Sequence, residues 1–183
     1  MRTATGPAAL VGACLLLGLA GCAAEPEGWE LPPDGPHEAY VDRVLSELAE
    51  IHADTLEEFA RTREIGDDVA ARLEATFTPE EARHRRTGLG NVLANDLEGF
   101  SGDQGPRPVA VRSLPRVADG CVLAEIDVPL ASGPAGVEPP ADAAVVVELH
   151  RADVDEATNP TGWVIAREEL VPDGDVEADP GCR

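Results

Sequence analysis

The chain has 183 residues and a net charge of −21, from 14 basic and 35 acidic side chains. Clustered cations bind nucleic-acid phosphates, so this charge argues against a nucleic-acid partner and against a domain lying flat on an anionic bilayer. Aromatic residues are scarce, with two Trp, one Tyr and three Phe, so we expect a core of Val, Leu, Ile and Ala. All 14 basic residues are Arg. With many Ala, Gly and Pro residues, this usage is typical of a GC-rich, actinobacterial genome.

The first 22 residues have the organisation of an export signal. Arg2 precedes an apolar stretch at 8–19, which is too short to cross a bilayer as a helix and has the length of a signal-peptide core. The stretch ends in the sequence Leu19-Ala20-Gly21-Cys22, whose small residues suit a signal peptidase. This sequence resembles the lipobox of bacterial lipoproteins. The resemblance implies a cleaved signal peptide at 1–21 and a diacylglycerol on the thiol of Cys22.

A lipid on Cys22 determines the expected location. Because two acyl chains hold a protein stably on a membrane, we expect a protein that is lipid-anchored to the cell membrane and faces the extracytoplasmic side. The alternative is an ordinary secretory signal, cut near Ala23 or Ala24, with Cys22 unmodified. Residues 22–36 are rich in Pro, Gly and acids and predict a tether. Within it, Trp29 and Leu31 are expected to dock on the domain, and the alternative is that they touch the membrane. That single domain spans 37–183 and ends in an acidic tail.

Hydrophobic periodicity predicts three helices at the start of this domain. Apolar residues at steps of three and four predict a helix at 37–63, and the pattern continues into a shorter helix at 65–76. The sequence Thr78-Pro79-Glu80-Glu81 is typical of a helix start, with Thr78 as the N-cap and Glu81 as its capping-box partner. It predicts a third helix at 79–98.

Alternating apolar residues predict strands in the second half. Segments 107–116 and 121–130 flank an Asp119-Gly120 turn and predict a β-hairpin, with one face of the second strand buried. Segments 143–150 and 163–170 predict a second strand pair. Helices followed by antiparallel strands indicate the α+β class. Three helices packed on a curved antiparallel sheet of about four strands resemble the NTF2-like (cystatin-cone) fold, which hosts enzymes, ligand carriers and interaction modules.

The cysteines predict one disulfide. Cys14 leaves with the signal peptide and Cys22 takes the lipid, so Cys121 and Cys182 remain as a pair in an oxidising compartment. A disulfide between them ties the C-terminal tail to a strand. The alternative is a metal site, which two cysteines without a nearby histidine pair do not favour.

His52 is the histidine with the most interesting position. It lies in the apolar stripe of the first predicted helix, where an NTF2-like cavity is expected. With Asp96 or Glu148 as its orienting partner, it is a candidate general base or pocket residue. The simpler interpretation is a histidine at the edge of the core, hydrogen-bonded to the backbone or to water.

One basic cluster stands out in this acidic chain, formed by Arg83, Arg85 and Arg86. On the third helix it is suited to an anionic partner, such as an envelope protein or a cell-wall polymer. The alternative is pairing with the glutamates of the first helix.

We therefore expect a membrane-anchored binding or assembly protein of the cell envelope, and we assign no catalytic residue, metal or cofactor. The alternatives are a small NTF2-like enzyme or hydrophobic-ligand carrier with a pocket near His52, and an acidic inhibitor of a basic enzyme.

Overall fold

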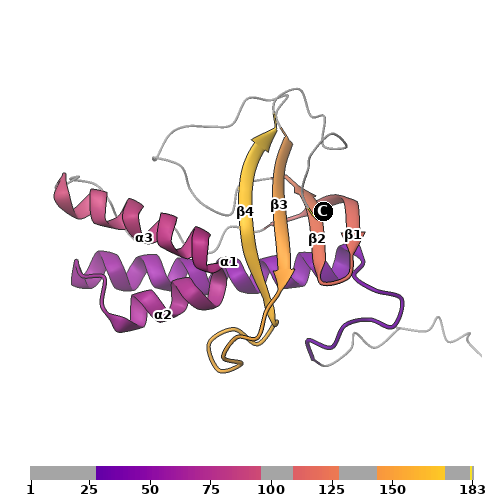
Figure 1. Cartoon of the computed structure of the whole chain (residues 1–183), viewed down its shortest axis with the longest axis horizontal. Coiled ribbons are helices and arrows are strands. Elements are labelled where there is room, and N and C mark those ends of the chain that lie inside the picture. Colours follow the sequence, from indigo (N-terminus) through magenta and orange to yellow (C-terminus); the bar gives the residue numbers. More distant parts are fainter. Residues whose placement is uncertain (1–27, 96–108, 128–143, 172–181, 183) are drawn as a thin grey trace, which may run out of the picture.

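The computed structural model describes residues 28–95, 109–127, 144–171 and 182. Within these ranges three helices come first: α1 (Glu38–Thr62), α2 (Asp67–Thr76) and α3 (Pro79–Ala94). They are followed by strands β1 (Val111–Ala118), β2 (Cys121–Ile126), β3 (Ala144–Arg151) and β4 (Trp163–Val171). The strands form one antiparallel sheet in the order β1-β2-β3-β4. The α+β prediction, with helices preceding a four-stranded antiparallel sheet, is confirmed (Figure 1).

Helix α1 is the main element packed on the sheet. His37 is its N-cap and accepts a hydrogen bond from the Tyr40 N–H, and Arg63 ends it in the left-handed conformation at a φ of 55°. One face of the helix is fully buried in the core, through residues that include Val44, Leu45, Leu48 and Phe59. The predicted helix at 37–63 is therefore confirmed to within one residue at each end.

The corner between α2 and α3 is fastened to the edge of the sheet. Phe77 forms a parallel bridge with Ile165 of β4, and the Thr78 N–H donates to the Ile165 carbonyl at 2.9 Å. Thr78 is the N-cap of α3 as predicted, but its side chain makes no capping hydrogen bond. The predicted capping box is wrong, because the Glu81 carboxylate accepts from Arg85 on the next turn of the helix. Helix α3 also ends four residues earlier than the predicted residue 98, at Ala94.

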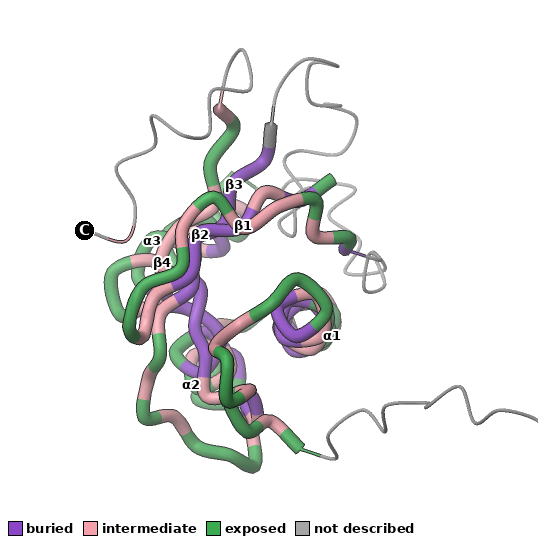
Figure 2. Tube along the Cα trace, turned by 90° about the vertical axis from the view of Figure 1, so that its right-hand side faces the viewer, coloured by how far each residue is buried: buried purple, intermediate pink, exposed green. Residues whose placement is uncertain are grey.

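The two faces of the sheet pack against different parts of the chain. Residues of the inner face contact the helices, as Val122, Ala124, Val147 and Leu149 do. On the outer face Leu123 and Val146 are also fully buried, and Val171 and Cys182 pack against them. The predicted buried face of β2 is confirmed at Val122, Ala124 and Ile126, whereas the burial of Leu123 on the opposite face was not predicted. Figure 2 shows α1 on one side of the sheet.

The predicted docking of Trp29 is confirmed. The Arg43 guanidinium lies 5.0 Å from the centre of the Trp29 ring and donates to the Gly28 carbonyl at 2.8 Å. The Tyr40 hydroxyl donates to the Trp29 carbonyl at 3.3 Å and accepts a hydrogen bond from the Trp163 indole at 3.0 Å. We call this set, Trp29, Tyr40, Arg43 and Trp163, the N-terminal clamp. Leu31, in contrast, is 47% exposed.

Candidate functional site

The predicted lipidation site, Leu19-Ala20-Gly21-Cys22, lies outside the described residues, as does Asp96. Among the described residues, no helix combines the length and apolarity that a bilayer-spanning segment requires. The features available for a site are therefore the disulfide, His52 and the arginine cluster.

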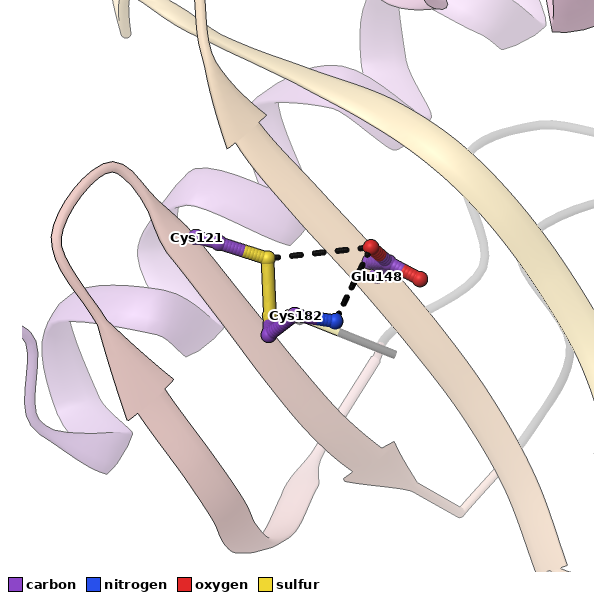
Figure 3. A group of neighbouring side chains, drawn as sticks. All are labelled: Cys121, Glu148 and Cys182. Carbon is purple, nitrogen blue, oxygen red and sulfur yellow. Dashed lines mark hydrogen bonds between the residues drawn. A yellow bond between two sulfur atoms is a disulfide. The ribbon is translucent and has the colours of Figure 1, made fainter. Parts of the chain in front are cut away.

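The predicted disulfide is present on the outer face of the sheet. Cys121 begins β2 and is bonded to Cys182, with a Cα–Cα distance of 5.6 Å. Figure 3 shows the disulfide in front of the strands with α1 behind them. Cys182 is thus joined covalently to the first residue of β2, an inner strand of the sheet.

Glu148 on β3 is the polar centre beside this disulfide. Its Oε2 accepts from the Arg167 Nε at 2.8 Å, while its Oε1 lies 2.8 Å from the His150 Nε2 and accepts from the Cys182 N–H at 3.2 Å. Oε1 also lies 3.7 Å from the Cys121 sulfur. This contact is not a hydrogen bond, because a sulfur in a disulfide carries no proton to donate. Burial acts to raise the pKa of Glu148, but hydrogen bonds from Arg167, His150 and the Cys182 N–H outweigh it and lower the pKa to about 2. The ionised carboxylate therefore joins β3, β4 and the C-terminal cysteine.

His52 is a packed core residue in this structure. Its side chain is on the buried face of α1, and its ring meets the Phe77 ring edge-on at a centroid distance of 5.2 Å. Burial, and secondarily the charge of Arg85, lowers the pKa of His52 to about 4, so the imidazole is neutral at pH 7. The proposed orienting partner Glu148 is wrong, because Glu148 lies with the disulfide on the outer face of the sheet.

The three arginines of the basic cluster occupy different environments. Arg85 folds inward, where it bonds Glu81 at 2.6 Å, lies 3.6 Å from the buried Glu168 and stacks over Phe77 at 5.1 Å. Arg86 is exposed and lies 3.8 Å from Glu74 of α2. The expected pairing with the glutamates of α1 is therefore wrong for both residues, whose acidic partners lie on α2, α3 and β4.

Arg83 and Arg86 border a pocket between α2 and α3. The pocket has a volume of about 360 Å³ and is lined by Ala70, Leu73, Glu74, Pro79, Ala82, Arg83 and Arg86. Arg83 is exposed, and its guanidinium makes no ion pair with any other described residue. A second pocket, beside His37 and Leu114, is far more open. Neither of these two pockets is lined by His52.

The cluster of Glu148, His150 and Arg167 around the disulfide is not predicted from the sequence. One signal was present, since Glu148 and His150 are two residues apart on a predicted strand and so share a face. What the sequence does not provide is the register that places Cys121 directly opposite His150. No family model, curated protein or solved structure matches this chain.

Proposed function

We propose that this protein is a lipoprotein of the cell envelope, anchored to the membrane through a lipidated Cys22, and that its α+β domain is a non-catalytic binding or assembly unit. The lipobox sequence supports the anchor. The Cys121–Cys182 disulfide supports an extracytoplasmic location, because such bonds persist in oxidising compartments.

The observation that carries the binding role is the pocket between α2 and α3. Its walls combine apolar side chains, such as Leu73 and Ala82, with the exposed guanidiniums of Arg83 and Arg86. Arg86 has one acidic neighbour, Glu74 at 3.8 Å, whereas Arg83 makes no ion pair among the described residues. An apolar surface beside such arginines suits a partner that offers carboxylate or phosphate groups next to nonpolar ones. Pro79 brings the N-terminal end of α3 to the same pocket, which also favours negative charge. We therefore assign the partner as an acidic envelope protein or an anionic cell-wall polymer.

Arg85 has a different role in this proposal. Its contacts with Glu81, Glu168 and Phe77 hold α3 on β4, so it positions the pocket and does not contact the partner. The NTF2-like assignment also belongs to the proposal, supported by three helices ahead of a four-stranded antiparallel sheet. The enzyme or carrier alternative has less support, because the His52 ring is packed against Phe77.

The test is charge reversal at the mouth of the pocket. The variant Arg83→Glu/Arg86→Glu is compared with Arg61→Glu, which changes an exposed arginine on α1 whose partner is Glu58. Each variant is produced in the native host and cross-linked in the membrane. It is then purified, and the bound partners are quantified by mass spectrometry. We expect the pocket variant to lose at least about 90% of its partner while the control retains it, as expected for the loss of one to two charge-assisted contacts. Retention of every co-purifying partner by a folded pocket variant contradicts the proposal.

A further inference from the structure

The pocket between α2 and α3 places an apolar surface beside charged groups. Leu73 and Ala82, which are only 2% and 4% exposed, provide part of its apolar lining. The charged residues among the described ones that line it are Glu74, Arg83 and Arg86, and all three are exposed. A ligand can therefore reach a guanidinium and an apolar surface at the same time.

The charges of this lining match a ligand group with a single negative charge. Two arginines and one glutamate give the lining a net charge of +1. Arg86 lies 3.8 Å from Glu74, whereas Arg83 makes no ion pair with any described residue. Arg83 is thus available to bind both oxygens of one carboxylate, the paired contact for which a guanidinium is shaped.

The size of the pocket limits how much of a partner enters it. Its volume of about 360 Å³ is near the lower end of the range for sites that hold whole small molecules, which is about 300–1,000 Å³. The pocket therefore has room for the end of a chain and not for a stretch of polymer.

We propose that this pocket binds the C-terminal end of a peptide chain, with the terminal carboxylate on Arg83 and Arg86 and an apolar last side chain against Leu73. In a peptide, a single carbon atom separates the terminal carboxylate from the last side chain, so the two groups reach adjacent charged and apolar surfaces together. Capture of a terminal carboxylate is a recurring mode of peptide recognition. This inference rests on the proposed binding role of the pocket and names the part of the partner that enters it.

The test is an NMR titration of the full mature chain with short peptides. The chain is labelled with ¹⁵N and carries Cys22→Ser, which keeps lipid and detergent out of the sample. One N-acetylated peptide, Gly-Ser-Gly-Ala-Leu, has a free C-terminal carboxylate, a second has the same sequence with a C-terminal amide, and a third is amidated and has an internal glutamate. We expect the free acid to shift backbone amides of α2 and α3 saturably, and the other two peptides to bind at least about tenfold more weakly. Equal binding of the free acid and its amide overturns the proposal.

Substitutions in the protein identify the groups that bind the carboxylate. Arg83→Gln and Arg86→Gln are each expected to weaken binding of the free acid at least about fivefold, because each removes a charge-assisted contact. Arg61→Gln, at the exposed pair with Glu58 on α1, is the matched control and should leave the affinity unchanged. Unchanged affinity in Arg83→Gln, with its amide spectrum otherwise that of the wild type, overturns the assignment of the carboxylate.

A last comparison separates failure of this inference from failure of the binding role. If the free acid does not bind and polyphosphate shifts the same amides, the partner is an anionic polymer and the chain-end assignment is overturned, while the binding role of the pocket stands. If Arg83→Glu/Arg86→Glu retains every co-purifying partner, the binding role itself is overturned.

Discussion

His52 shows how one buried side chain makes the stability of this protein depend on pH. Its pKa is lowered from the ordinary value of 6.5 to about 4 by burial and by the nearby charge of Arg85. A base with a lowered folded-state pKa contributes fully to stability above pH 6.5, and that contribution is lost as the pH falls toward 4, because the unfolded chain binds the proton first. The low pKa of Glu148 acts chiefly below this window, toward pH 2.

Replacing His52 by leucine tests this dependence. As the pH falls from 6.5 to 4, protonation of His52 should lower the free energy of unfolding of the wild type by up to about 3 kcal/mol. The His52→Leu variant has no such group, so its free energy of unfolding should fall less over the same range. Urea denaturation at a series of pH values measures the difference. The exposed His84→Gln should follow the wild type. Parallel stability curves for His52→Leu and the wild type across this range contradict the assignment of His52 as a buried neutral histidine.

At the scale of elements, the outer face of the sheet depends on the C-terminal cysteine. Leu123 and Val146 are 0% exposed on that face, and Cys182 packs against them while its N–H bonds Glu148. The disulfide thus holds the Cys182 side chain over apolar side chains on the face of the sheet opposite the helices.

Removing the disulfide should destabilise the protein strongly. The bond joins residues 61 positions apart, and closing a loop of this size restricts the unfolded chain by about 4 kcal/mol. We expect Cys121→Ser/Cys182→Ser to lose up to about that free energy of unfolding, measured by denaturant titration. Arg61→Glu, at an exposed ion pair, should change stability by about 1 kcal/mol or less. A double variant as stable as the wild type contradicts this account of the outer face.

For the whole molecule, sequence reasoning succeeded where the signals are local and failed where they depend on register. The helix at 37–63 and the Asp119-Gly120 turn follow from residue spacing alone, and both are observed. Pairing across the 128–143 segment is not a local property. For that reason the sequence did not reveal that His52 and Glu148, which were predicted to be partners, lie on opposite sides of the sheet. The inward fold of Arg85 was likewise unpredictable, because its partner Glu168 is more than 80 positions away.

The proposed lipid anchor on Cys22 has a direct test. Denaturing mass spectrometry of protein extracted from its own membranes should give a chain that begins at a diacylated Cys22 and lacks two hydrogens for the Cys121–Cys182 bond. Cys22→Ser should abolish lipidation and release the protein from the membrane fraction, because the acyl chains on Cys22 are the proposed attachment. An unmodified wild-type chain that begins at Ala23 or later contradicts the anchor and indicates a secreted protein.

The N-terminal clamp has a geometric consequence for a lipid-anchored chain. If Cys22 carries the proposed lipid, residues 22–27 lie between it and Gly28, whose carbonyl accepts from Arg43, and a chain of that length spans at most about 20 Å. Helix α1 begins near the clamp and its 25 residues extend for about 37 Å, with α2 and α3 at its far end (Figure 1). With the proposed lipid on Cys22, the end of α1 at the N-terminal clamp would stay close to the bilayer, while α3, which carries Arg83 and Arg86, lies toward the opposite end of α1.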